Sequence, residues 1–492
     1  MYEMMFQKCR DLNVCAHRER FPKYLTQDAV SLLKKFLNTN PRCRLGARGD
    51  TRAFLRHPFL KKVNWEAVLW KHVTPPGKPQ TLVFFLVNPA EPGDADDLRR
   101  HPSIKNIHQE AILKAKSDVQ KVNTLADHFA QVFQPHTPDP TDDDIRDTLP
   151  APDINTLPAS PIKTFTATEV RAAINRLHST KAPVYDPITG EILKQLPTAG
   201  ISAITYTFNS ILRTGYFPGQ WKVSQIITIL KPGKPAEDVQ SYRPFSLLPV
   251  LSKVFEKLFI ARLQPILQST QIIPDHQFGF RHKHATIEQV HRIISTIHRA
   301  LENKHYCTAA FLDISQAFDK VWHEGLLYKL KTFLPLNMYN ILQSYLTNRH
   351  FRTKYREAYS SLRPVLAGVP QGSVLGPLLY LTFTADLPTL ANSTTATFAD
   401  DTAILTVHEN PAEATHRPQL HLNEIQSWLK TWRIRANETK SVQVTFTLNK
   451  LTCPPVQLNN EQLPQADEVK YLGIHLDRRL TWRKHITTKR KQ

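Results

Sequence analysis

The chain has 492 residues, 41% of them hydrophobic, which is enough to bury cores in about two to four domains. Its 63 lysine and arginine residues exceed its 43 aspartate and glutamate residues, and the formal net charge of +20 favours a polyanionic partner, although membrane-surface proteins share this balance. The 5 cysteines are scattered and odd in number, which excludes a disulfide-stabilised secreted domain, and the apolar run 81–87 is far shorter than the ~18 residues that span a bilayer.

Residues 1–80 combine a helical pattern with a series of short motifs. Ala29, Val30, Leu33 and Leu37 recur at helical spacing. The motifs after this helix are Arg44-Leu45-Gly46, His57-Pro58-Phe59, Asn64-Trp65-Glu66 and Val73-Thr74-Pro75-Pro76. They resemble the last helices and the start of the tail of a protein kinase C type (AGC) kinase. This segment has no Gly-rich loop, catalytic His-Arg-Asp or Asp-Phe-Gly motif, so we predict a non-catalytic kinase C-lobe remnant fused to the rest of the chain.

Residues 1–20 are mixed in charge and contain no apolar stretch of the kind that a secretory signal requires. We therefore expect an intracellular chain, in the nucleus and/or the cytoplasm. It is expected neither to be secreted nor to bind a membrane.

Residues 81–160 are predicted to be a connector. A helical segment is expected from about Ile104 to Phe133, and repeated prolines with the acidic stretch 139–147 favour a flexible linker after it. Thr166-Ala167-Thr168-Glu169 then has the pattern of a capping box, in which the Thr and Glu side chains bond to backbone donors at the start of a helix. The next domain is therefore expected to begin near residue 161.

Between residues 217 and 281 lie four short motifs rich in basic residues, glycine and proline. They are Phe217-Pro218-Gly219-Gln220-Trp221-Lys222, Leu230-Lys231-Pro232-Gly233-Lys234, Ser241-Tyr242-Arg243-Pro244-Phe245-Ser246 and His276-Gln277-Phe278-Gly279-Phe280-Arg281. A single lysine or arginine in such a motif is more often a solvated surface charge than a ligand, so no motif alone decides the function.

Ala309–Leu312 is a predicted strand that ends at Asp313. The residues after it have a helical pattern, with Phe318, Val321 and Trp322 on one side. Taken alone, an aromatic residue on such a face belongs to the core more often than to a site.

A second acidic segment lies at Asp400-Asp401. Ala396–Ala399 and Thr402–Val407 are rich in β-branched and aromatic residues and are predicted to be strands joined at these aspartates, which places both carboxylates at a hairpin tip. Aspartates are common in turns, and periodicity does not show that this hairpin lies beside Asp313. Three carboxylates that did converge there would offer oxygen ligands to two Mg²⁺ ions, the arrangement that brackets an in-line phosphoryl displacement.

The segment Ala367-Gly368-Val369-Pro370-Gln371-Gly372-Ser373 lies between the two acidic segments, and Asn437-Glu438-Thr439-Lys440 and Tyr471-Leu472-Gly473-Ile474 come after them. The whole ordered series resembles the reverse transcriptase of a jockey-type non-LTR retrotransposon. The resemblance implies a right-hand polymerase of the α/β (α+β) class, with fingers at 161–308 and, at 309–492, a palm on an antiparallel sheet with a truncated thumb. The reverse transcriptase core is expected at about 211–480.

The resemblance also implies a metal site. Asp313, Asp400 and Asp401 would bind two Mg²⁺ ions, with Mn²⁺ as a substitute, and the backbone carbonyl of Ile314 would be a further ligand. Lys440 matches a lysine that is proposed to protonate the pyrophosphate leaving group.

A nucleotide pocket is implied in the same way. Lys231 and Arg243 would contact the triphosphate, and Gln371 and Gly372 would line the pocket for the template and the nucleotide. Phe318 stands five residues after Asp313, where the family places an aromatic gate against a 2′-hydroxyl.

The implied function is RNA-directed DNA polymerisation, with an RNA template, a DNA primer and dNTPs as partners. Some residues depart from the family pattern: Val184 and Pro187 stand where glycines are usual, and Phe245 replaces a small aliphatic residue. The family's endonuclease domain is not expected on the N-terminal side. Two alternatives stay open: a catalytically silent, nucleic-acid-binding remnant of such an element, and a kinase-related interaction protein.

Overall fold

The computed structural model describes residues 117–137, 161–178, 184–231, 233–236 and 238–490, together with the helical residues Gln27 and Ser31. The chain divides into two compact units, one formed by Met1–Ile104 with Leu196–Gly200, the other by Lys105–Gln195 with Ile201–Gln492. The sheets and the site described below lie in the second unit. The kinase-like motifs at 44–76 fall outside the described residues, and the domain boundaries stay predictions.

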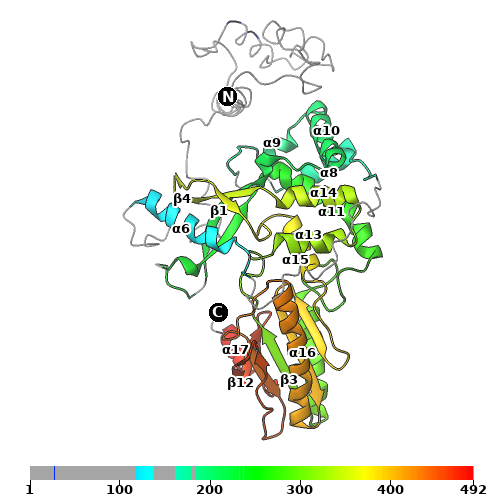
Figure 1. The fold of residues 1–492 in the computed structure, drawn as a ribbon, viewed down its shortest axis with the longest axis vertical. Coiled ribbons are helices and arrows are strands. Elements are labelled where there is room, and N and C mark those ends of the chain that lie inside the picture. The colour runs from blue at the N-terminus through cyan, green and yellow to red at the C-terminus, as the bar shows by residue number, and fades with distance from the viewer. Residues whose placement is uncertain are drawn as a thin grey trace. The chain divides into compact units, whose positions relative to one another are not determined.

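The sheet that carries the acidic segments has the strand order β12-β9-β3-β8-β7 (Figure 1). β3 (Tyr306–Leu312) is buried along its length and pairs antiparallel with β8 (Asp401–His408) and with β9 (Val442–Phe446). β7 (Thr394–Phe398) pairs antiparallel with β8, and the short β12 (Gln465–Ala466) pairs parallel with β9 at the opposite edge. The predicted mixed α/β fold is therefore confirmed, and its predicted antiparallel sheet has one parallel edge strand.

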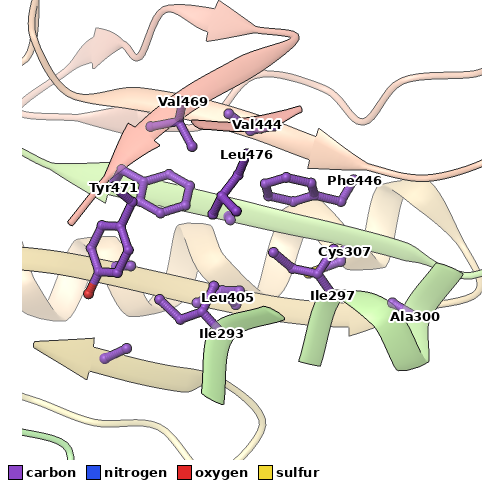
Figure 2. Packing of buried hydrophobic residues seen from close by; sticks show 14 of the residues in the cluster. Ile293, Ile297, Ala300, Cys307, Leu405, Val444, Phe446, Val469, Tyr471 and Leu476 are labelled. Atoms are coloured by element: carbon purple, nitrogen blue, oxygen red, sulfur yellow. The ribbon is translucent and has the colours of Figure 1, made fainter. Parts of the chain in front are cut away.

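Helices cover both faces of this sheet. On one face, α12 (Thr286–Glu302) and the hairpin of β13 (Glu468–Tyr471) and β14 (Ile474–Asp477) pack against alternate residues of the central strands, as Figure 2 shows for Ile293, Ile297, Cys307, Leu405, Phe446, Tyr471 and Leu476. On the other face lies α16 (Pro411–Thr431), where the Thr406 hydroxyl donates to the Ala414 carbonyl at 2.9 Å. Because Thr406 adjoins Leu405 in β8, the two side chains point to opposite faces.

A second sheet has the order β2-β1-β4-β5, with β6 paired to β4. Its strands are β1 (Val223–Leu230), β2 (Tyr242–Leu247), β4 (Arg349–Tyr355), β5 (Ala358–Tyr359) and β6 (Arg363–Val365). β1 pairs antiparallel with β2 and parallel with β4. β1 and β2 lie in the segment 161–308 predicted to form the fingers, whereas β4, β5 and β6 lie in the segment predicted to form the palm. The assignment of this sheet to the fingers stays a prediction.

Helix α6 (Asp118–Val132) packs on the second sheet. It begins with a capping box formed by Ser117 and Gln120, and its buried residues share a core cluster with Ile226 and Phe351. Leu366 N and Ala367 N both donate to Phe133 O at 2.9 Å. The helix predicted from about Ile104 to Phe133 is thus present over the described residues, and it is part of the sheet's core.

The structure contains further helices and one more hairpin. The helices are α8 (Ala167–Asn175), α9 (Gly190–Lys194), α10 (Thr198–Thr214), α11 (Val250–Ser269), α13 (His323–Lys331), α14 (Leu336–Leu346), α15 (Leu375–Phe383) and α17 (Arg483–Arg490); two short strands, β10 (Gln457–Leu458) and β11 (Glu461–Gln462), form a separate hairpin. The predicted capping box at Thr166 and Glu169 is confirmed at the start of α8. In the described part of the chain, no helix has the length and apolar character needed to cross a membrane.

The helix predicted directly after Asp313 is wrong in its position. Ser315 N donates to Arg435 O at 2.9 Å, so this backbone donor is used by a distant segment, and Gln316 has a φ of +51°, outside the helical range. Residues 315–320 consequently form turns, and α13 begins only at His323.

Candidate active site

The predicted hairpin at Asp400 and Asp401 is confirmed, because β7 and β8 pair antiparallel and the turn between them carries Asp400. In the register of β3 and β8, Leu312 pairs with Thr402. Asp313, the residue after Leu312, therefore lies at the same sheet edge as Asp401, which precedes Thr402. The structure thus brings together acidic segments that are almost 90 residues apart in the sequence.

The charges at this edge influence one another. Burial, together with the charges of Asp400 and Asp313, raises the pKa of Asp401 to about 6. Burial also raises the pKa of Asp400, where Asp313 adds to the increase and Arg243 opposes it. The three carboxylates therefore lie near enough to repel one another, and this is the environment that a divalent cation relieves.

A turn before β9 holds the backbone of Asp313. Asn437 N donates to Asp313 O at 2.7 Å, and Asp313 N donates to Ser441 Oγ at 3.0 Å. Lys440, predicted from its motif, lies in this turn with Nζ 3.8 Å from Asp313 Oδ2. Ile314, the predicted carbonyl ligand, bridges to the residue before Asn437. Sequence reasoning missed Ser441, because its contact joins residues 128 positions apart.

Phe318 is held by two other rings. It stacks on Tyr380 with ring centroids 4.4 Å apart, and Phe280 meets it edge-on at 5.9 Å. Tyr380 is buried, and the charges of Asp400 and Asp401 add to the effect of burial in raising the pKa of its hydroxyl. The Phe318–Tyr380 stack therefore lies within electrostatic reach of Asp400 and Asp401, and the gate role of Phe318 stays a prediction.

Lys231 and Arg243 come from the β1–β2 hairpin of the second sheet. Lys231 N donates to Ser241 O at 2.8 Å, and Lys231 Nζ donates to Gln240 O at 2.7 Å. Burial lowers the pKa of Lys231, and the charges of Arg243 and Lys440 lower it further. Arg243 is thus within electrostatic reach of Asp400, and Lys231 is within reach of Arg243 and Lys440.

Gln371 and Gly372 lie in the loop before α15. Ser246 N donates to Gln371 O at 2.8 Å. Gly372 has a φ of +114°, and a Cβ there would lie 2.4 Å from Ser246 O, so glycine permits the close approach of this loop to β2. Gln371 Nε2 also donates to Asp319 Oδ1 at 2.8 Å. Asp319 is buried, and this burial raises its pKa to about 7. The sequence analysis did not identify Asp319, because its burial is visible only in the folded structure.

Comparison with known proteins assigns this arrangement to a family. The sequence profile of the family described as reverse transcriptase (RNA-dependent DNA polymerase) matches residues 229–476, which include both sheets' predicted site residues. The chain belongs to the reverse transcriptase family. The matched region of this reverse transcriptase extends from the end of β1 to β14.

Two relatives from Drosophila melanogaster are similar over most of the chain. One, named "Probable RNA-directed DNA polymerase from transposon BS", is 42% identical over 388 residues, or 76% of this chain. The other, the RNA-directed DNA polymerase from mobile element jockey, is 41% identical over 382 residues. The reverse transcriptase chain spans 43% and 41% of the lengths of these two relatives. A shorter match, 33% identical over 94 residues, joins 19% of the chain to protein kinase C of Drosophila melanogaster.

The donor set of the reverse transcriptase suits a hard divalent cation, because Asp313, Asp400 and Asp401 present carboxylate oxygens. Burial, with a further contribution from their mutual repulsion, raises the pKa values of Asp400 and Asp401. Asp313 and Asp401 are also exposed, so ions can reach them. Among the residues that the structure describes, no three acidic, histidine or cysteine side chains are arranged as a ready-made coordination shell.

A small cavity of about 30 Å³ lies behind the hairpin of the reverse transcriptase, lined by Leu312, Gln277, Tyr380, Ala399 and Thr402 among others. Pockets for ligands of drug size are ~300 Å³ or larger.

Proposed function

We propose that this chain is an RNA-directed DNA polymerase of a jockey-type non-LTR retrotransposon. It would add deoxynucleotides from dNTPs to the 3′-hydroxyl of a DNA primer, along an RNA template. The observation that carries the proposal is the convergence of Asp313, Asp400 and Asp401 at one sheet edge. Arg243 lies within electrostatic reach of Asp400, and Lys231 within reach of Arg243. Both similar relatives are named as RNA-directed DNA polymerases, which supports the same reaction.

Asp313, Asp400, Asp401 and the carbonyl of Ile314 would hold two Mg²⁺ ions. When bound, such ions polarise the reacting phosphate and stabilise the attacking and leaving oxygens. The residues of the chain orient the substrates around that centre. Asn437 and Ser441 fix the backbone of Asp313, so that its carboxylate stays at the sheet edge.

The basic residues would bind the triphosphate. Arg243 offers a planar fork of donors to phosphate oxygens, whereas Lys231 and Lys440 provide compact charges. Lys440 would donate a proton to the leaving pyrophosphate, and its position, with Nζ 3.8 Å from Asp313 Oδ2, supports this role. Burial is the main cause of the lowered pKa of Lys231, and the positive charges of Arg243 and Lys440 lower it further. These neighbouring positive charges favour binding of a polyanion.

Phe318 would select the sugar. Its ring is clamped by Tyr380 and Phe280, so it cannot swing away from a 2′-hydroxyl without breaking two aromatic contacts. Gln371, held by Asp319, would contact the nucleotide beside Gly372.

The test is primer extension on an RNA template with dNTPs and Mg²⁺. We expect the wild-type chain to extend the primer, the Asp400→Asn, Asp401→Asn double variant to be inactive, and Asp275→Asn, which changes a fully exposed carboxylate, to match the wild type. Equal amounts of extended primer from the wild type and the double variant would contradict the proposal that the chain is a polymerase. If the wild type then still retains the primer–template in a filter-binding assay, the chain is a silent nucleic-acid-binding protein.

The match to protein kinase C supports a second, narrower proposal, that residues 1–80 are a kinase-derived segment without kinase activity. Their motifs resemble the end of a kinase C-lobe and not its catalytic loop. Sequencing a full-length transcript tests whether the fusion is encoded, and labelled ATP with a generic substrate tests for phosphorylation. We also propose an intracellular location, in the nucleus and/or the cytoplasm, which imaging of the tagged full chain tests.

A further inference from the structure

The loop from His276 to Phe280 is attached to the catalytic hairpin by backbone hydrogen bonds. Thr397 N donates to His276 O at 3.0 Å, and Phe278 N donates to Thr397 O at 2.9 Å. The loop thereby extends the sheet beyond β7 by one parallel bridge. It reaches the turn that carries Asp400 from a segment more than 100 residues earlier in the sequence.

Within this loop, the side chain of Gln277 binds the residue just before Asp400. Gln277 is only 4% exposed, and its Oε1 accepts from Ala399 N at 2.9 Å and from Gly279 N at 2.7 Å. Its Nε2 donates to Ala399 O at 3.2 Å. One amide group therefore satisfies both backbone polar groups of Ala399.

Ala399 needs such support because its backbone is strained. Its φ is +58°, in the left-handed region, which costs an L-residue other than glycine ~1–2 kcal/mol. The residue after it is a carboxylate repelled by Asp313, so the turn would relax away from the acidic edge if nothing held it. The two hydrogen bonds from Gln277 hold the peptide groups on either side of Ala399 in the orientation that presents Asp400.

Gly279 makes the close approach possible. A Cβ at this position would lie 2.2 Å from Ala399 N and 2.9 Å from Ala399 Cα, closer than side-chain atoms come to backbone. The loop is therefore pressed directly against the turn, and the Gln277 amide reaches Ala399 without an intervening side chain.

We propose that Gln277 is a positioning residue, which fixes the left-handed turn at Ala399 and so aims the Asp400 carboxylate at the position where a divalent cation binds. This inference rests on the proposed polymerase function. Gln277 touches neither the substrate nor the ion and acts only through Ala399.

The chain contains a matched control. Gln443, on β9, is 1% exposed and clamps another loop in the same way, since its Nε2 donates to Pro454 O at 2.9 Å and its Oε1 accepts from Val456 N at 2.7 Å. Gln277→Met and Gln443→Met each remove a buried amide clamp while keeping most of the side-chain volume. Their effects on folding should therefore be similar, and only the first should disturb the site.

The experiment measures kcat, KM for dNTP and the Mg²⁺ concentration for half-maximal rate in primer extension, and separately the affinity for Mn²⁺ by electron paramagnetic resonance without nucleic acid. For Gln277→Met we expect kcat to fall ~10–100-fold and Mn²⁺ affinity ~10-fold, with a higher Mg²⁺ requirement and an unchanged KM, because residues that orient metal ligands have effects of this size. Gln443→Met should match the wild type in all four. Gln277→Glu keeps the acceptor for Ala399 N, loses the donor to Ala399 O, and should give an intermediate loss, which retains a test if Gln277→Met does not fold.

The outcomes separate the two proposals. If the wild type does not extend primers but Gln277→Met alone loses Mn²⁺ affinity, positioning by Gln277 stands and the polymerase function fails. If the wild type is active and both Gln277 variants keep its Mg²⁺ requirement and Mn²⁺ affinity, the positioning role is overturned. The positioning role is also overturned if Gln443→Met loses as much kcat and Mn²⁺ affinity as Gln277→Met does. A wild-type chain that binds no Mn²⁺ overturns both.

Discussion

Replacing Asp401 by asparagine should make the folded protein more stable while abolishing catalysis. Asp401 has its pKa raised from 3.8 to about 6 by burial and by two neighbouring carboxylates. For a fully buried group this change would correspond to ~3 kcal/mol of destabilisation at pH 8. Because the Asp401 side chain is exposed, solvent screening reduces this destabilisation. We therefore expect the free energy of unfolding of Asp401→Asn to exceed that of the wild type by ~1 kcal/mol.

The sign follows from proton binding. Between pH 3.8 and about 6 the folded chain holds a proton on Asp401 more tightly than the unfolded chain does, so the stability of the wild type falls as the pH rises through this window. The asparagine has no charge to ionise. The advantage of Asp401→Asn should therefore be complete above pH 7 and shrink as the pH falls toward 5.

Urea denaturation followed by tryptophan fluorescence, at pH 5, 6, 7 and 8 in EDTA, measures this difference. Asp275→Asn serves as the control, because its side chain is fully exposed. Saturating Mg²⁺ should then reduce the difference in unfolding free energy between Asp401→Asn and the wild type, since an ion that binds only the folded wild type stabilises it by mass action. A variant less stable than the wild type at pH 8, or a gain that does not change with pH, would refute the reasoning.

Three further changes test other parts of the site and its support. Phe318→Val should allow ribonucleotides to be incorporated, with the ratio of UTP to dTTP use in primer extension rising at least ~10-fold and stability changing little. Lys440→Ala should lower kcat in primer extension ~100-fold, which is the lower end of the range for general acid catalysis. The midpoint of unfolding should stay the same, because the ion pair with Asp313 is solvent-exposed. Lys440→Arg should be equally slow if Lys440 acts by donating a proton. Lys329→Met should lower the free energy of unfolding by ~2 kcal/mol in urea titrations, because it removes a buried cation that stacks 3.6 Å from the Trp432 ring centre and pairs with the half-exposed Asp386.

The sequence predicted those parts of the site whose signal is local. The hairpin at Asp400 and Asp401 was recognisable because β-branched and aromatic runs flank two turn-forming aspartates, and Asp313 because it ends a strand. The capping box at Thr166 and Glu169 was recognisable from four residues. Motif order supplied the family, since composition and periodicity alone left the carboxylates unconnected.

Contacts between distant segments were beyond the sequence patterns. Nothing near Gln277 indicates that its amide binds Ala399, 122 residues later, and burial of Asp319 depends on the loop that carries Gln371. The helix expected after Asp313 failed for the same reason, because Ser315 gives its backbone donor to Arg435. Local helical spacing was overruled by a tertiary hydrogen bond.

The docking of α6 has a consequence for the synthesis of this protein. The helix is fixed by partners that the ribosome makes much later, as in the ion pair between Asp127 and Arg363, 236 residues apart. At ordinary translation rates the apolar face of α6 lacks its packing partners for ~10–50 s, until β4 and β6 emerge from the ribosome. During that interval it is a target for chaperones, and in a fragment ending before β4 it would remain one.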